Sequence, residues 1–170
     1  MWRRRTLLAG LGAVLGACNF RPLYLAQGKT SEPVRAELAA IEIEGLGGRL
    51  GFLVRNALLD ELNPATAPVP PRYVLSVQLY SRADPLGIQL DNVVTRYNLL
   101  VSAAFQLRAK PQNELLYASQ VHRVASFNVS REPYADLIAS QEAERRAAQE
   151  VATDIRTLLA VQFARAPAVT

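Results

Sequence analysis

Three long segments of the chain alternate between apolar and polar residues, which is the pattern of strands that bury one face and expose the other. They span Tyr73–Arg82, Val93–Arg108 and Leu115–Phe127, although Ser119 and Arg123 blur which face of the third is the inner one. The connections between the segments are short enough for hairpins. The sequence therefore predicts an antiparallel meander of three strands with one covered face.

The rest of the pattern adds one strand and two helices. Residues 37–44 alternate as a half-buried strand does, and a run of glycines follows them. From Arg49 to Leu62 the apolar residues fall at helical spacing, and Pro133 opens a second helix that reaches about Phe163. The predicted order is β-α-β-β-β-α. This is an α+β fold, with a four-stranded, mainly antiparallel sheet that carries two helices on one face.

The N-terminal segment has the pattern of a signal peptide. Arg3–Arg5 are followed by an unbroken run of small and apolar residues, Thr6–Ala17, and then by Cys18. The run has about 12 residues, so a helix of roughly 18 Å would fall short of a hydrocarbon core of about 30 Å. Because Cys18 directly follows Leu-Gly-Ala, the segment resembles a bacterial lipobox. That resemblance implies cleavage before Cys18 and acylation of its thiol and amine.

These patterns divide the chain into four parts. The segment between the anchor and the domain contains two prolines and a glycine without helical or strand periodicity, so we expect a tether. The expected parts are a signal peptide at 1–17, a lipid-anchored N-terminal arm at 18–33, a single α+β domain at 34–165 and a C-terminal tail at 166–170.

Composition and charge remove several classes of function. The chain has 170 residues, half of them apolar, and one cysteine, which cannot build a disulfide framework or a cysteine-rich zinc site. The formal charge is +4, but three of the 19 basic residues lie in the leader, which leaves 16 basic against 15 acidic residues. A nearly neutral mature chain lacks the cations that phosphate neutralisation requires, so we expect no nucleic-acid partner.

Candidate catalytic chemistry is weak. The glycines between residues 45 and 51 do not match the spacing of a dinucleotide fingerprint and are better interpreted as a strand-to-helix turn. His122 is the single histidine and lies in a predicted strand, where a structural role is favoured over that of a general base. No triad or paired-carboxylate motif is present. We therefore expect no enzyme, no cofactor and no metal site.

One set of residues carries a binding hypothesis. Arg82, Arg108 and Lys110 lie at the predicted turns, residues 82–90 and 108–114. Guanidinium and ammonium groups attract the phosphates of anionic lipid head groups. The alternative is ordinary solubilising charge at turns.

Two segments resemble the LptE family of lipopolysaccharide-assembly lipoproteins, in particular its alphaproteobacterial type. The first is Cys18-Asn19-Phe20-Arg21-Pro22-Leu23-Tyr24, in which Asn19 replaces the typical Gly; the second is the C-terminal helix from Tyr134 to Leu158. The resemblance implies an outer-membrane lipoprotein on the periplasmic side that plugs the β-barrel LptD, helps it assemble and binds lipopolysaccharide. In enterobacterial lipoproteins an Asp directly after the Cys retains the protein at the inner membrane, so the resemblance to lipoproteins implies that Asn19 favours the outer membrane. The alternative is a small-lipid shuttle or an envelope scaffold without a barrel partner.

Overall fold

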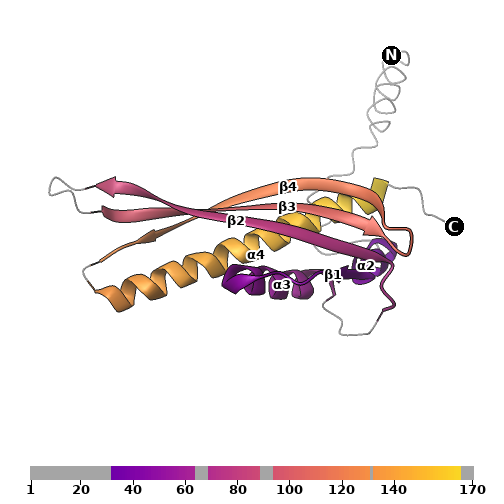
Figure 1. Cartoon of the computed structure of the whole chain (residues 1–170), viewed down its shortest axis with the longest axis horizontal. Helices are drawn as coiled ribbons and strands as arrows, with labels where there is room; N and C mark the ends of the chain where they lie inside the picture. The colour runs from indigo at the N-terminus through magenta and orange to yellow at the C-terminus, as the bar shows by residue number, and fades with distance from the viewer. Residues whose placement is uncertain (1–31, 64–68, 89–93, 131, 166–170) are drawn as a thin grey trace, which may run out of the picture. The chain divides into compact units, whose positions relative to one another are not determined.

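The computed structural model describes residues 32–63, 69–88, 94–130 and 132–165. These residues form a four-stranded sheet with its helices on one side (Figure 1). The elements, in chain order, are α2 (Glu32–Ala39), β1 (Ile41–Ile43), α3 (Gly48–Leu62), β2 (Tyr73–Ile88), β3 (Val94–Ala109), β4 (Glu114–Asn128) and α4 (Pro133–Arg165).

The sheet confirms the predicted fold class. Its strand order is β1-β2-β3-β4; β2 pairs antiparallel with β3, and β3 with β4. The short strand β1 pairs parallel with β2, over Tyr73–Leu75 only. The sheet is therefore mixed but mainly antiparallel, as the alternation predicts.

The prediction of one strand over residues 37–44 is wrong in its first half. Residues up to Ala39 belong to the helix α2, which begins at Glu32, inside the expected arm, and only Ile41–Ile43 form a strand. Val34 and Leu38 are four residues apart and both are buried, so they form the apolar stripe of a helix. The alternation of residues 41–44 directly after them favoured a strand instead. The element order therefore has one more helix at its start than predicted.

The predicted turn at residues 82–90 is also corrected, because β2 continues through it to Ile88. The pairing with β3 passes Asp84 and Pro85 and then shifts register around Gly87. A proline is tolerated here because β1 has ended by this point, so this edge of β2 has no partner strand that needs the missing N–H. Arg82 consequently lies within a strand.

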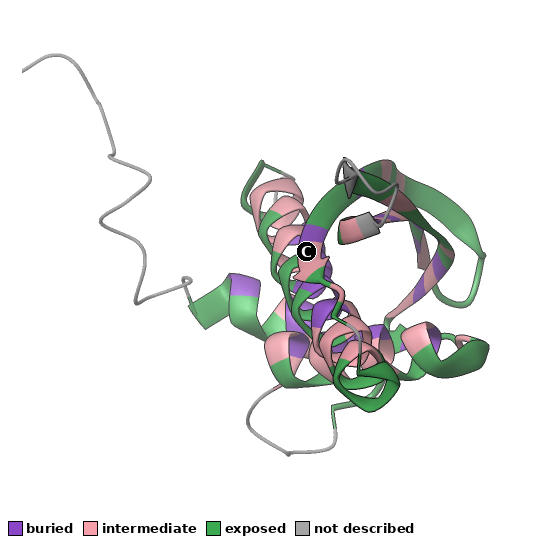
Figure 2. Ribbon diagram, turned by 90° about the vertical axis from the view of Figure 1, so that its left-hand side faces the viewer, coloured by how far each residue is buried: buried purple, intermediate pink, exposed green. Residues whose placement is uncertain are grey.

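The two long helices pack beside each other and run in the same direction. Arg49 of α3 pairs with Glu144 of α4 at 2.9 Å, and Glu61 pairs with Arg156 at 3.6 Å, so both contacts join residues 95 positions apart. Figure 2 shows buried residues where these helices meet the inner face of the sheet. The largest fully buried side chains come from both layers: Phe105, Leu58, Leu75, Leu107, Ile155, Leu159, Val54, Val101 and Val151.

The ambiguous third strand has its inner face toward α4. Val121 and Ala125 of β4 are buried, and Arg123 lies between them on the same face. Its Nε and Nη2 atoms donate to the two carboxylate oxygens of Asp154 on α4, both at 2.5 Å. This hydrogen-bonded carboxylate raises the pKa of Arg123 further above its ordinary value. An arginine fits this face because it reaches a carboxylate on the covering helix.

The glycine segment is a turn between β1 and α3, as expected. Gly48 has a φ of +75°, which strains any residue with a side chain. A Cβ atom at Gly51 would lie 2.9 Å from the carbonyl carbon of Leu46. Both glycines are therefore required by backbone geometry.

Tyr73 ties α2 to β2, and its substitution by phenylalanine tests this tie. The Tyr73 hydroxyl donates to Glu37 at 2.8 Å, and Arg72 pairs with the same carboxylate oxygen at 2.8 Å. Removing the hydroxyl should lower the free energy of unfolding at neutral pH by about 1 kcal/mol. Tyr134→Phe is the matched control, since Tyr134 is 76% exposed. Urea denaturation measures both, and equal stability of the two variants would contradict the tie.

The same tie predicts a pH dependence. Burial, and then the hydrogen bond and negative charge of Glu37, raise the pKa of Tyr73 above its ordinary value. The folded state therefore favours the protonated phenol, whose contribution is fully present below about pH 10 and is lost as pH rises through the raised pKa. We expect the stability difference between wild type and Tyr73→Phe to shrink on the alkaline side of about pH 10, measured in the same urea experiment.

Candidate functional site

The open face of the sheet is the candidate site, because the helices cover only the other face. Residues that alternate with the buried ones lie on this open face, and the strand register places them in rows across β2, β3 and β4. Three consecutive rows contain no Lys, Arg, Asp or Glu. In chain order these rows are Ser76–Gln106–Ala118, Gln78–Ala104–Gln120 and Tyr80–Ser102–His122.

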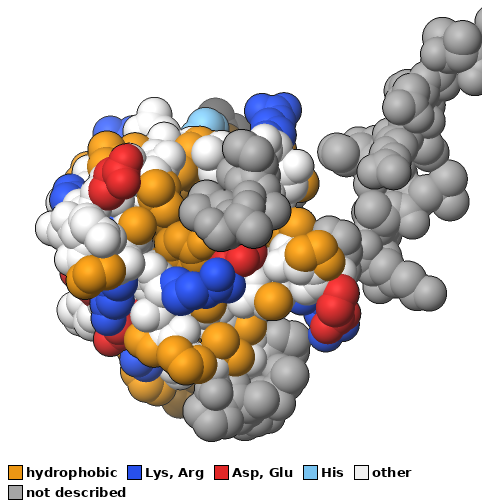
Figure 3. All heavy atoms as spheres, turned by 90° about the vertical axis from the view of Figure 1, so that its right-hand side faces the viewer, with side chains coloured by type: hydrophobic (Ala, Val, Ile, Leu, Met, Phe, Trp, Pro, Cys, Tyr) orange, Lys and Arg blue, Asp and Glu red, His pale blue; other side chains and the backbone are white. Residues whose placement is uncertain are grey.

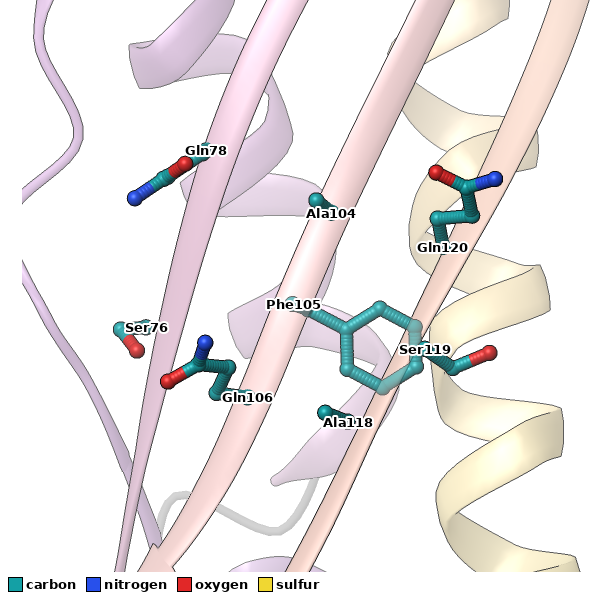
Figure 4. Close-up of a pocket in the computed structure, with 8 residues that line it drawn as sticks. All are labelled: Ser76, Gln78, Ala104, Phe105, Gln106, Ala118, Ser119 and Gln120. Carbon is teal, nitrogen blue, oxygen red and sulfur yellow. The ribbon is translucent and has the colours of Figure 1, made fainter. Parts of the chain in front are cut away.

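A shallow hollow of about 460 Å³ lies over the first two of these rows. Figure 4 shows one glutamine on each strand around Ala104: Gln78 from β2, Gln106 from β3 and Gln120 from β4. Ala104 and Ala118 leave the space because their side chains are short. Ser76, Phe105 and Ser119 complete the lining. The hollow thus offers neutral hydrogen-bonding groups around small residues.

The three predicted basic residues do not come together. Arg82 lies opposite Leu100 of β3, whereas Arg108 lies eight residues further along that strand. At about 3.3 Å per residue, this separates their backbones by about 26 Å. Lys110 lies beyond the end of β3, on the side of Arg108. One head group cannot reach both Arg82 and Arg108 across this distance.

Each of these residues has a partner of its own. Arg82 pairs with Asp84 at 2.9 Å, and Lys110 pairs with Glu42 of β1. Arg108 instead donates to the side-chain oxygen of Gln106 at 2.8 Å. Figure 3, which faces the end of the molecule that holds the β3–β4 turn, shows Lys and Arg side chains scattered among acidic and hydrophobic ones. The binding role of the three residues stays a prediction.

The other residues considered in the sequence, His122 and Cys18, lie apart from these basic side chains or outside the described residues. His122 is exposed on the open face, in register with Ser102. Cys18, the predicted lipidation site, lies outside the described residues. Within the described ranges, no group of three His, Cys, Asp or Glu side chains is placed to hold a metal ion. The helices of that same part of the chain include none long and apolar enough to cross a membrane.

Sequence reasoning missed the hollow. The alternation assigned Gln78, Gln106 and Ser76 to exposed faces, but it could not say which residues of neighbouring strands are opposite one another. Register depends on turn geometry and on packing of the inner face. The available signal was the absence of charge from three successive outward positions in each strand, which are Ser76, Gln78 and Tyr80, then Ser102, Ala104 and Gln106, then Ala118, Gln120 and His122.

Comparisons with known proteins agree with this fold. A family model described as LptE, lipopolysaccharide-assembly, matches residues 35–159. A lipoprotein of Caulobacter crescentus has a solved structure with a TM-score of 0.67 and 29% identity, covering 80% of this chain and 99% of that one. A minor lipoprotein of Acinetobacter baumannii has a TM-score of 0.52 and 15% identity, covering 72% of this chain and 90% of that one. Among curated proteins, none matches the chain.

The separation of the basic residues predicts independent effects on lipopolysaccharide binding. Arg82→Ala and Arg108→Ala should each weaken binding at low salt by at most about 1 kcal/mol, because exposed charge contacts contribute little. The double variant should lose the sum of the two within about 0.5 kcal/mol. Titration of the four proteins with lipopolysaccharide, at low and moderate salt, measures this. A loss well above the sum would show that one head group contacts both residues.

Proposed function

The chain belongs to the LptE family of lipopolysaccharide-assembly proteins, and from this premise we propose that it partners the β-barrel LptD as a plug and assembly factor. It would also bind lipopolysaccharide during transport to the outer leaflet. Membership of this family and the lipoproteins that share the fold make the protein an envelope lipoprotein with a role in lipopolysaccharide assembly. The match over residues 35–159 is the observation that carries the proposal.

The filled interior of the domain supports a plug over a lipid shuttle. A shuttle needs an apolar cavity between its layers, whereas here side chains of α3, α4 and the sheet occupy that space as one cluster of buried residues. The hollow of about 460 Å³ lies on the outer face instead. The lumen of a membrane-spanning barrel is polar, so a domain with a polar sheet face can lie there without burying unpaired groups.

The groups on the open face of the sheet support a non-enzymatic role. The three charge-free rows of the open face carry amides, hydroxyls and one imidazole, without a carboxylate or thiol beside His122 in its row. A nucleophile and a base within hydrogen-bond distance would be needed for hydrolysis. We therefore propose that the protein acts by binding alone.

Co-purification tests the barrel partnership. The full chain, tagged at its C-terminus, is expressed in its own bacterium and recovered from membranes in mild detergent. We expect a large outer-membrane β-barrel to be enriched with it. The matched control joins residues 1–33 to an unrelated soluble domain, so that it keeps the anchor and loses the fold. Equal recovery with both proteins, or no barrel with either, would contradict the proposal and favour the shuttle or scaffold.

Substitution of Cys18 tests the outer-membrane anchor. We expect Cys18→Ser to abolish acylation and release the protein from the membrane, because each buried methylene of an acyl chain contributes about 0.8 kcal/mol to binding. Asn19→Gly, which restores the residue typical of the family, should stay anchored. Intact-mass analysis and membrane fractionation measure both. A wild-type chain that still begins at Met1, or whose Cys18 is unmodified, would contradict the anchor.

A further inference from the structure

The three charge-free rows at the centre of the open face differ in composition from the rows beside them. Charged side chains occur in the rows on either side of it, with Arg82 in the row beyond Tyr80 and Arg108 in the row beyond Ser76. Between them, the exposed groups are the amides of Gln78, Gln106 and Gln120, the rings of Tyr80 and His122, and small side chains. Because charge would be the ordinary composition of an exposed sheet, its absence over three rows needs a reason.

The amides are arranged to bind a ligand that both donates and accepts hydrogen bonds. A glutamine side chain offers one carbonyl acceptor and two N–H donors. Arg108 already donates to the Oε1 atom of Gln106, which leaves the amide nitrogen of Gln106 as a donor. Strand register places Gln78 and Gln120 on either side of Ala104, and Figure 4 shows them with Gln106 on three neighbouring strands.

An acyl chain does not fit this surface. It would displace water from three amides without replacing their hydrogen bonds, and each unsatisfied polar group costs about 1–3 kcal/mol. A phosphate does not fit either, because the nearest arginines lie at the margins and each already has a hydrogen-bond partner, Asp84 for Arg82 and Gln106 for Arg108. A neutral ligand rich in hydroxyl groups remains.

Tyr80 adds an apolar surface beside the amides. It lies two residues from Gln78 on the same face of β2, about 7 Å away along the strand, and its side chain is 61% exposed. An aromatic ring of this kind offers a flat apolar face and a polar hydroxyl. The C–H groups of a sugar ring pack on such a face while its hydroxyls bind the neighbouring amides.

We propose that the hollow around Ala104 binds neutral carbohydrate, namely the uncharged sugars in the saccharide part of lipopolysaccharide. This inference rests on the proposed function for the identity of the glycan. It assigns the saccharide to Gln78, Gln106, Gln120 and Tyr80, and not to the basic residues Arg82, Arg108 and Lys110, which lie outside the three charge-free rows. The hollow of about 460 Å³ lies within the range of about 300–1,000 Å³ that is usual for small-molecule sites.

The test measures glycan binding to the full mature chain, purified from membranes in lauryldimethylamine oxide, a detergent without a sugar head group. The probe is the oligosaccharide of the bacterium's own lipopolysaccharide after removal of phosphates and reduction of carboxyl groups. We expect saturable binding by calorimetry with a Kd on the order of 1 mM. Because no charge takes part, raising the salt from about 50 to about 300 mM should leave the Kd unchanged within about twofold.

Two variants separate shape from hydrogen bonding. Ala104→Phe fills the centre of the hollow, and Gln120→Met keeps the side-chain length but removes the amide. Each should raise the Kd by about tenfold or more, which corresponds to the loss of roughly one good contact. Ala135→Phe on α4 and Gln112→Met in the β3–β4 turn are the matched controls, since both residues are exposed and lie outside the strands that line the hollow. Circular dichroism confirms that all four remain folded.

Several outcomes would overturn the proposal. They are the absence of saturable binding, unchanged affinity of folded Ala104→Phe, or binding that weakens with salt as contacts to the basic residues would. A wild-type dimer that Ala104→Phe converts to a monomer in sedimentation would assign the face to a second copy instead. Failure here with barrel co-purification intact contradicts only the saccharide site. Oligosaccharide binding without a recovered barrel contradicts only the proposed function.

Discussion

Burial of one face of the meander under α4 is the constraint on which the rest of the structure depends. A helix of 33 residues, about 50 Å long, covers the inner side chains of β3 and β4 and packs beside α3. Its buried residues include four alanines, Ala143, Ala147, Ala148 and Ala152. Such short side chains allow close approach, so the interior fills with the larger side chains of the sheet, such as Phe105 and Leu107.

This one-sided burial decides where function can lie. The covered face of the sheet is packed and uncharged, apart from Arg123. This arginine lies on the edge strand β4 and pairs with Asp154 of α4. The open face meets water and is free of packing demands, so its side chains are available for binding. The domain therefore has one packed face and one solvent-exposed face of the sheet. The exposed face suits a protein that acts by contact with larger partners.

The hairpin geometry also decides what charges can do. In a meander the two turns lie at opposite ends of the strands, and long strands place them far apart. Arg82 on β2 and Arg108 on β3 are thus separated although both lie on the same open face. Local ion pairs, such as Arg82 with Asp84, further reduce the charge available to an anionic ligand.

The amino-acid pattern by itself determined the fold class, the two long helices, the three long strands and the inner faces of the first two strands, because burial of one face imposes periods of two and 3.6 residues. It did not determine that residues 32–39 are helical, since Val34 and Leu38 make only one helical repeat before the alternation of Ile41 and Ile43 begins. It also did not place Arg123, which has the polarity of an exposed residue and the position of an inner one.

Only the tertiary structure decided the candidate site. The residues around the hollow are up to 44 positions apart, from Ser76 to Gln120, and strand register brings them into adjacent rows. Register is a property of the assembled sheet, because it depends on turn geometry and on how the inner side chains pack against α4. The same assembly separated the basic residues that the linear order placed at neighbouring turns. Periodicity reports which side of a strand faces water, whereas the neighbours across the sheet are set by the fold.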